Sequence, residues 1–235
     1  MKNIKITDMT LCRNKALSFK ERIEIARLLD RLNVDCIELP AIDNVKSDTL
    51  LIRTISSFVK ESRLSVCCGY CLDGVELAAA ALSNTKNPEI RVELPMSPVG
   101  MEYTCHKKAP AMLELVKELV ANAKEKCQNV QFCAVDATRA EEQVLIDAIN
   151  IAIEAGATSV TVCDTTGEML PDEFALFVEN IKKNVKETEF AVSIEDKNGM
   201  ATAASVLAVK AGADGVKTAV SGGVASLETF ACLIK

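Results

Sequence analysis

Short apolar stretches alternate along the whole chain with longer amphipathic stretches. The apolar ones are roughly five to eight residues long, rich in Val, Ile and Cys, and bounded by polar or turn-forming residues, which is typical of buried strands. The predicted strands are Asn3–Thr10, Asp35–Ile42, Leu64–Tyr70, Glu89–Met96, Val130–Val135, Ser159–Cys163, Phe190–Ile194 and Gly215–Val220.

A stretch with helical periodicity follows each strand. The first is the clearest, because Ser18 can cap its start and Glu21 stands three residues later, as in a capping box. A loop containing Pro98 and Gly100 is expected after the fourth strand. The predicted helices are Ser18–Leu32, Ser47–Glu61, Leu72–Ser83, Pro110–Lys126, Ala140–Ala155, Pro171–Lys186, Met200–Ala211 and Ser226–Lys235.

Eight strand–helix units in succession predict an α/β fold in which a parallel sheet closes on itself as a single (β/α)8 TIM barrel. An open, doubly wound sheet is the alternative. That fold typically has a glycine-rich first turn, whereas residues 10–14 here read Thr-Leu-Cys-Arg-Asn. No linker or low-complexity segment interrupts the chain, so residues 1–235 are expected to form one domain.

Composition and charge argue against nucleic acid and membranes as partners. The net charge is −6 and the isoelectric point is about 5.1, which disfavours nucleic acid as a partner. No apolar run approaches the length of about 18 residues that a membrane span needs, and the start MKNIKITD has no apolar signal core. We therefore expect a cytoplasmic protein with no membrane partner.

The ten cysteines lie mostly inside predicted strands and helices rather than in a short, loop-rich scaffold. The cluster Cys67–Cys71 suggests a zinc clip at first sight. It lacks a second CxxC pair, and the only histidine, His106, stands in a polar loop and is expected at the surface. Buried free thiols are the preferred interpretation.

Chemistry in a parallel barrel is expected where strands end and the following loops begin. Carboxylates crowded around one mouth repel each other unless cations neutralise them, and several basic residues are placed to do so. Asp8, Asp136 and Asp164 could instead only cap turns or helices, and Lys15 and Lys197 could be solvated loop residues. The polar residues at these positions are Asp8, Thr10, Glu38, Glu93, Asp136, Arg139, Asp164, Thr165, Thr166, Glu195, Asp196 and Lys217, with Arg13, Lys15 and Lys197 nearby.

Several segments together resemble one family. Residues 6–11 (ITDMTL) are similar to a first-strand I-x-D-T-T-L motif, and residues 97–103 (SPVGMEY) to an S-P-I-H-M-E-Y segment. Residues 36–38 (CIE), 136–139 (DATR), 154–157 (EAGA) and 164–167 (DTTG) match further units. The whole chain thus resembles the catalytic barrel of the DRE-type TIM metallolyases, which include 2-isopropylmalate, homocitrate and citramalate synthases and lyases of the hydroxymethylglutaryl-CoA type.

The departures from this family fall on its functional positions. The resemblance implies a divalent metal held by an aspartate and two histidines, and a catalytic arginine and histidine. The family's metal-binding Asn has no evident counterpart in residues 222–225. The residues found at the other positions are Cys12 for the catalytic Arg, Arg13 for the metal-binding Asp, Lys15 for a Glu, Gly100 for the catalytic His, Ser193 and Glu195 for the metal-binding His pair, and Lys217 for a Glu. We expect no metal and no other cofactor.

Three functional hypotheses follow. The preferred one is a diverged, metal-free homologue that is catalytically silent or serves as a partner subunit. The alternative is an active, metal-independent synthase, aldolase or lyase acting on a small 2-oxo or hydroxy acid; an unrelated binding module is a third possibility. A small carboxylic acid is the expected ligand, and a homo-oligomer or a family partner subunit is the expected assembly. The candidate catalytic residues are Arg13, Arg139 and Lys217, and the candidate substrate-binding residues are Asp8, Glu38, Asp136, Asp164, Thr165 and Glu195.

The alternative assigns specific roles. Arg13 or Arg139 would hold a carboxylate, Thr165 would contact it as the matching family threonine does, and Lys217 would be the electrophile or base. Independently of activity, the exchange of charge at Arg13 and Glu195 predicts an ion pair between them, with Glu38 or Asp136 as a second acceptor.

Overall fold

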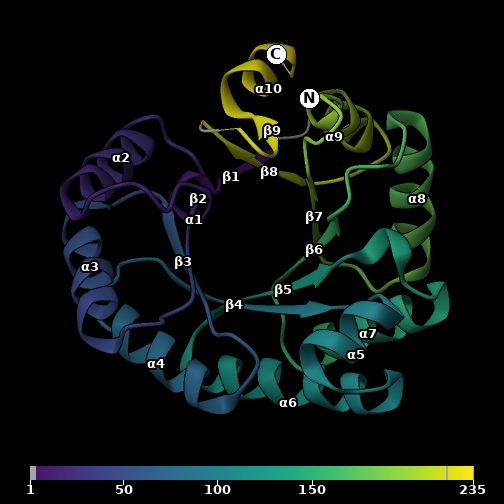
Figure 1. The fold of residues 1–235 in the computed structure, drawn as a ribbon, viewed down its shortest axis with the longest axis horizontal. Coiled ribbons are helices and arrows are strands. Elements are labelled where there is room, and N and C mark those ends of the chain that lie inside the picture. The colour runs from purple at the N-terminus through teal and green to yellow at the C-terminus, as the bar shows by residue number, and fades with distance from the viewer. Residues whose placement is uncertain (1–3, 221, 235) are drawn as a thin grey trace.

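A computed structural model of the chain describes residues 4–220 and 222–234. Within this part, eight parallel strands follow one another in chain order, and the first pairs with the eighth to close a barrel. Figure 1 shows the closed ring of strands surrounded by helices. The predicted (β/α)8 TIM barrel is therefore confirmed. The strands are β1 (Lys5–Asp8), β2 (Cys36–Leu39), β3 (Arg63–Cys67), β4 (Pro88–Pro95), β5 (Asn129–Val135), β6 (Ser159–Asp164), β7 (Glu189–Ile194) and β8 (Gly215–Ala219), with a short β9 (Ala225–Ser226) added beside β8.

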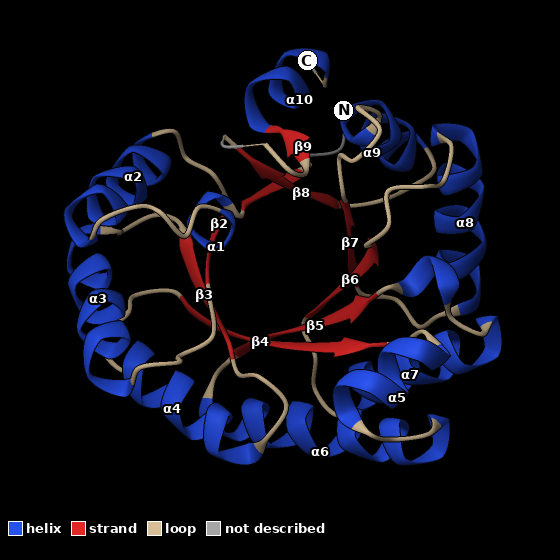
Figure 2. Ribbon diagram, viewed as in Figure 1, coloured by secondary structure: helices blue, strands red, loops and turns tan. Residues whose placement is uncertain are grey.

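The helices form the outer layer (Figure 2). They bury apolar side chains against the outward faces of the strands, and one continuous apolar core fills this shell. None of the helices in the described ranges is long and apolar enough to cross a membrane. Their bounds are α1 (Thr10–Arg13), α2 (Phe19–Arg31), α3 (Val45–Phe58), α4 (Leu72–Leu82), α5 (Pro98–Cys105), α6 (Ala109–Lys126), η1 (Ala137–Arg139), α7 (Glu142–Glu154), α8 (Pro171–Asn184), α9 (Ala201–Lys210) and α10 (Leu227–Leu233).

Two short helices at the barrel mouth differ from the sequence-based expectation. Thr10 was expected to end the first strand, but it begins α1. The segment with Pro98 and Gly100 was expected to be a loop, but it forms α5. Pro98 occupies the first turn, where its missing N–H costs nothing, and the Ser97 hydroxyl accepts a hydrogen bond from the Gly100 amide at 3.1 Å.

Most other bounds differ from the predicted ones by a few residues. The predicted capping box at Ser18 and Glu21 is confirmed, because each side chain accepts a hydrogen bond from the other residue's amide. The second predicted helix starts earlier than expected, because α3 begins at Val45 rather than at Ser47 and Asn44 caps it. The predicted first strand began at Asn3 and the predicted last helix ended at Lys235, and both residues lie outside the described residues.

The inside of the barrel is polar because side chains alternate along each strand. In β4, Ile90, Val92 and Leu94 are fully buried in the apolar shell beneath the helices. The two residues between them, Arg91 and Glu93, point the other way and contact side chains of β2 and β3 inside the barrel. This alternation builds the candidate site.

Candidate functional site inside the barrel and at its mouth

Glu38 on β2 points into the barrel interior and is fully buried. Its two carboxylate oxygens face two cations, one on Lys217 of β8 and the other on Arg91 of β4. Oε1 lies 2.5 Å from Lys217 Nζ, and Oε2 lies 3.7 Å from Arg91 Nη1. Neither oxygen accepts a well-directed hydrogen bond from a described residue. Charge attraction therefore compensates the burial of this carboxylate.

Arg91 links this pair to the barrel mouth. Its Nε donates to Glu93 Oε1 at 2.6 Å, its Nη1 donates to the Ser65 hydroxyl at 3.2 Å, and its Nη2 donates to the Leu39 carbonyl at 3.2 Å. The side chain is only 2% exposed. Burial alone would raise the pKa of Glu93, but the Arg91 and Lys217 cations outweigh it and hold that pKa at about 2. Glu93 is therefore ionised at neutral pH.

Lys217 was expected at the end of a strand, and it lies within β8, 1% exposed. Its Nζ is also 3.6 Å from the Cys133 sulfur. Burial opposes the ammonium charge, yet Cys133 and Glu38 outweigh that effect and raise the pKa of Lys217 above its ordinary value. A lysine held protonated in this way is poorly suited to act as a base or a nucleophile.

Thiols surround this cluster. The Cys133 and Cys163 sulfurs are 3.3 Å apart, and the Cys12 sulfur lies 3.9 Å from Arg91 Nη2. Burial raises the pKa of Cys12 to about 12, so this thiol is protonated and unreactive at neutral pH. All ten cysteines of the chain are free, including Cys67 and Cys71 of the suspected zinc clip.

Arg13 and Glu195 meet at the rim, as the sequence predicted. Arg13 Nη1 donates to Glu195 Oε2 at 3.0 Å, and Nη2 donates to Oε1, so the pair is bidentate. The two side chains are 27% and 22% exposed. The second acceptors proposed for Arg13 are wrong: Lys217 and Arg91 already neutralise Glu38, and Arg139 binds Asp136.

Asp136 and Arg139 form a separate pair after β5. Arg139 donates to both Asp136 oxygens, at 2.8 and 2.6 Å, and 52% of its side chain is exposed. The Asp136 amide donates to the Thr165 hydroxyl at 2.9 Å, and Lys197 Nζ donates to the Thr165 carbonyl at 3.2 Å. The ends of β5, β6 and β7 are thereby tied together next to an exposed guanidinium.

Asp164 and Asp8 have local structural partners. Asp164 accepts hydrogen bonds from the Thr138 and Thr166 hydroxyls and the Gly167 amide, which fixes the turn after β6. Asp8 Oδ1 accepts from the Thr10 amide at 2.9 Å, while Oδ2 is buried without a partner among the described residues. Burial raises the pKa of Asp8 to about 6.

The side chains at the mouth do not fit a divalent metal. Among the described residues, no group of three or more His, Cys, Asp or Glu side chains is arranged to hold one. A divalent ion at Glu38 would lie against the Lys217 and Arg91 cations, and two unit charges 4 Å apart repel by about 4 kcal/mol at an effective dielectric constant of about 20. The carboxylate at Glu195 is already engaged by Arg13.

Comparison with known proteins identifies the family to which this barrel belongs. The model of the HMGL-like family matches residues 4–235, essentially the whole chain. The chain belongs to the HMGL-like family. It is 32% identical over 228 residues to a 2-isopropylmalate synthase of Aquifex aeolicus and 34% identical over 228 residues to one of Shouchella clausii. These alignments cover 94% of the chain but 44% of either relative, so the chain spans less than half the length of these curated proteins.

Solved structures share the fold. The HMG-CoA lyase of Bacillus subtilis superposes with a TM-score of 0.83 at 16% identity, covering 100% of this chain and 86% of that one. The HMG-CoA lyase of Pseudomonas aeruginosa gives a TM-score of 0.81 at 15% identity, covering 99% and 85%. At such identities the likeness establishes the barrel fold and nothing about chemistry.

Sequence reasoning missed Arg91, which contacts more of the interior cluster than any candidate it named. The signal was present, because Glu89, Arg91 and Glu93 alternate with apolar residues in a predicted strand. Functional side chains were expected only at strand ends, whereas Arg91 lies in the middle of β4 and reaches the site through its long side chain.

Proposed function

We propose that this chain is an HMGL-like barrel that has lost metal-dependent condensation or cleavage and serves as a catalytically silent partner subunit of another family protein. The observation that carries the proposal is the environment of Glu38, whose two oxygens face Lys217 and Arg91. Carboxylates crowded at a barrel mouth require positive charges to neutralise them. Here they come from the chain itself.

The rim supports the same proposal. By the resemblance described above, Arg13 and Glu195 stand where the family places an acidic and an imidazole ligand, and here they bind each other. An internal ion pair satisfies both side chains without a metal. The cytoplasm is the proposed location, which ten free cysteines support.

A second candidate function is a metal-independent synthase, aldolase or lyase for a small 2-oxo or hydroxy acid. The observation in its favour is the exposed guanidinium of Arg139 beside Thr165, a pair of groups that could hold a substrate carboxylate. Arg13 suits this role less, because Glu195 occupies both its terminal nitrogens. The protonated Lys217 would stabilise a developing oxyanion rather than act as the base.

Release of coenzyme A distinguishes a catalytically silent barrel from an active synthase. The purified chain is incubated with acetyl-CoA and a panel of 2-oxo acids, without metal and with Mg²⁺, Mn²⁺ or Zn²⁺, and the free thiol is measured. The 2-isopropylmalate synthase of Aquifex aeolicus serves as the positive control. We expect no turnover under any condition. Turnover that requires a metal would overturn the proposal, and metal-independent turnover lost in Arg139→Ala would establish the second candidate.

A further inference from the structure

Cys68 and Cys71 form a Cys-x-x-Cys pair in the turn that joins β3 to α4 (Figure 1). Both thiols are free, and among the described residues no third side chain completes a metal site with them. In a chain built from strand–helix units, a pair with this spacing at the start of a helix is typical of a redox-active dithiol.

The backbone holds the two cysteines at the separation that a disulfide requires. They are the first and last residues of a four-residue turn with Gly69 and Tyr70 at its centre. The ends of such a turn lie within about 7 Å of each other, and disulfides join Cα atoms about 4.4 to 6.8 Å apart. Gly69 has a φ of +67°, which glycine adopts without strain. Rotation of the two side chains is therefore enough to bring the sulfurs together.

The first turn of α4 holds this segment in place. A Cβ atom at Gly74 would lie 1.9 Å from the Cys68 carbonyl oxygen, so only glycine lets the turn pack this closely on the helix. The Gly74 amide also donates to the Cys71 carbonyl at 3.1 Å. Both cysteines are thus held through their backbones, and neither thiol is needed for these contacts.

The two thiols differ in their access to solvent. Cys71 is exposed, and it makes no side-chain capping hydrogen bond although it immediately precedes α4. Cys68 is 2% exposed, and burial raises the pKa of its thiol to about 12, an effect that Arg91 opposes and Cys71 adds to. A reagent from solution therefore meets Cys71 first, while Cys68 is shielded from it.

Other thiol pairs are less suited to bridging. Cys67 points into the barrel, where its thiol donates to Glu93 at 3.5 Å. The Cys133 and Cys163 sulfurs are 3.3 Å apart, but Cys133 pairs in register with Thr161, two residues before Cys163. With a rise of about 3.3 Å per residue and strands about 4.8 Å apart, their Cα atoms are about 8 Å apart. A disulfide there would require a strand to move.

We propose that Cys68 and Cys71 are a thiol–disulfide exchange site, oxidised by small disulfides such as glutathione disulfide and reduced by small thiols. The Cys71 thiolate attacks one sulfur of the small disulfide, its S–S bond breaks, and one small thiol leaves with the proton that Cys71 released. The Cys68 thiol then gives up its proton and attacks the Cys71 sulfur, which expels the second small thiol with that proton. Two electrons pass from the protein to the small disulfide. This inference is independent of whether the barrel is catalytic.

Thiol labelling after equilibration tests the proposal. The full chain is equilibrated under argon with mixtures of reduced and oxidised glutathione, quenched with acid, unfolded and alkylated, and its labels are counted by mass spectrometry. We expect the labelled cysteines to fall by two, from all ten, as the oxidised share rises, and dithiothreitol to restore them. Trypsin leaves Cys67, Cys68 and Cys71 in one peptide, residues 64–86, whose only label should be on Cys67.

Single substitutions identify the role of each thiol. Cys71→Ser should abolish the disulfide, whereas Cys68→Ser should stop the reaction with one glutathione attached to Cys71. Cys232→Ser is the matched control, because Cys232 is the other exposed cysteine and has no Cys-x-x-Cys partner, and it should leave the disulfide unchanged. Circular dichroism verifies that each variant is folded, and peptide mapping of the parent chain decides if the buried Cys68→Ser is not.

Three results would overturn the proposal. The first is labelling of all ten cysteines at every glutathione ratio. The second is a bridge that includes any cysteine other than Cys68 and Cys71. The third is a parent chain that stops with glutathione attached to Cys71 and never forms the internal disulfide.

Discussion

At the scale of single residues, Arg13 and Glu195 illustrate how this barrel manages its charge. They come from opposite ends of the chain, 182 residues apart, and bind each other in a bidentate pair. The segment around Val224 bridges Glu195, and Gly223 lies beside the Arg13 guanidinium. The pair thus closes the rim where β1, β7 and the segment after β8 meet.

A double-mutant cycle measures this pair. Arg13→Ala and Glu195→Gln should each lower the free energy of unfolding, and the two losses should be non-additive by about 1 to 2 kcal/mol, because both side chains are partly shielded from water. Urea denaturation of the four proteins provides the values. Strictly additive losses would mean that the pair contributes nothing.

The buried Glu38–Lys217 pair should be less tolerant of change. Lys217→Met leaves the Glu38 carboxylate with only Arg91, at 3.7 Å, and should cost about 3 to 5 kcal/mol. Removing both charges in Glu38→Leu with Lys217→Met should recover most of that loss, because a missing partner costs more than a missing pair. Thermal and urea unfolding test this order, and a double variant less stable than the single one would contradict it.

Asp8 should make the protein less stable as pH rises. Burial raises its pKa from 3.8 to about 6, although hydrogen bonds from Thr10 oppose the shift and Glu38 and Glu228 add to it. The folded chain therefore binds this proton more tightly than the unfolded chain. The stabilisation is complete below about pH 4 and is lost as pH rises through 6, a change of about 2 to 3 kcal/mol.

Asp8→Asn isolates this effect. The amide keeps an acceptor for the Thr10 N–H and does not ionise, so the variant should be more stable than the parent at pH 8 and lose the slope between pH 4 and 6. Glu93 has the opposite effect on stability. Its pKa is lowered from 4.5 to about 2, so its contribution to the free energy of unfolding is lost only as pH falls below 4.5. Urea denaturation at a series of pH values distinguishes the two, and an unchanged slope in Asp8→Asn would refute the assignment.

At the scale of elements, short-range signals were predictable and tertiary ones were not. The capping box at Ser18 needs only residues three apart, and it was predicted correctly. Helix α1 was missed because nothing local distinguishes the end of β1 from the start of a helical turn at Thr10. Helix α5 was missed because Pro98 and Gly100 suggest a loop, although proline also suits a first helical turn.

The Ser18 cap has a measurable consequence. Ser18→Ala leaves the Glu21 amide without its hydroxyl acceptor and should lower the free energy of unfolding by about 1 kcal/mol. Ser57→Ala in α3 is a suitable control: the exposed Ser57 hydroxyl donates only to the Thr54 carbonyl of its own helix. Chemical denaturation of both variants tests the difference, and equal losses would show that the cap contributes nothing.

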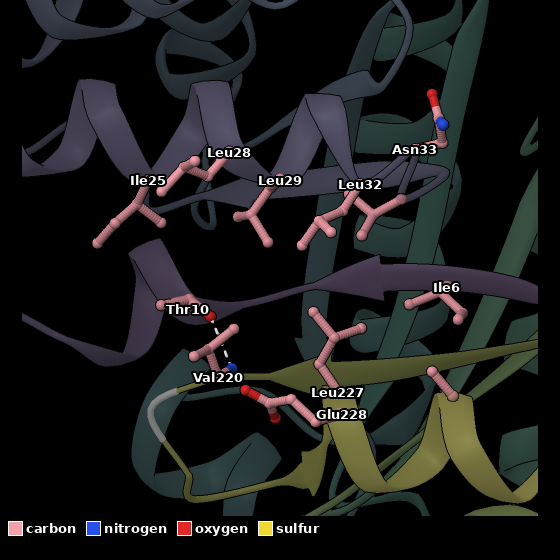
Figure 3. A pocket seen from close by; sticks show the side chains of 12 residues that line it. Ile6, Thr10, Ile25, Leu28, Leu29, Leu32, Asn33, Val220, Leu227 and Glu228 are labelled. Atoms are coloured by element: carbon pink, nitrogen blue, oxygen red, sulfur yellow. Dashed lines mark hydrogen bonds between the residues drawn. The ribbon is translucent and has the colours of Figure 1, made fainter.

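At the scale of the whole molecule, alternation of strands and helices was enough to predict the barrel. Most side-chain contacts inside the barrel could not be predicted from the sequence. The Arg13–Glu195 pair could be anticipated only because the family resemblance aligned both positions with one centre. Arg91 could not, because its role depends on a long side chain crossing from β4 toward β2 and β3. The apolar groove between α2 and α10 likewise appears only once the ring has closed (Figure 3).

The central claim is that cations of the chain itself take the place of a divalent ion at Glu38. Titration of the purified, chelator-treated protein with Mn²⁺, monitored by electron paramagnetic resonance of the free ion, tests it most directly. We predict no saturable site up to about 1 mM, since the repulsion from Lys217 and Arg91 opposes binding. One equivalent of bound Mn²⁺ that Glu38→Gln abolishes would contradict the account.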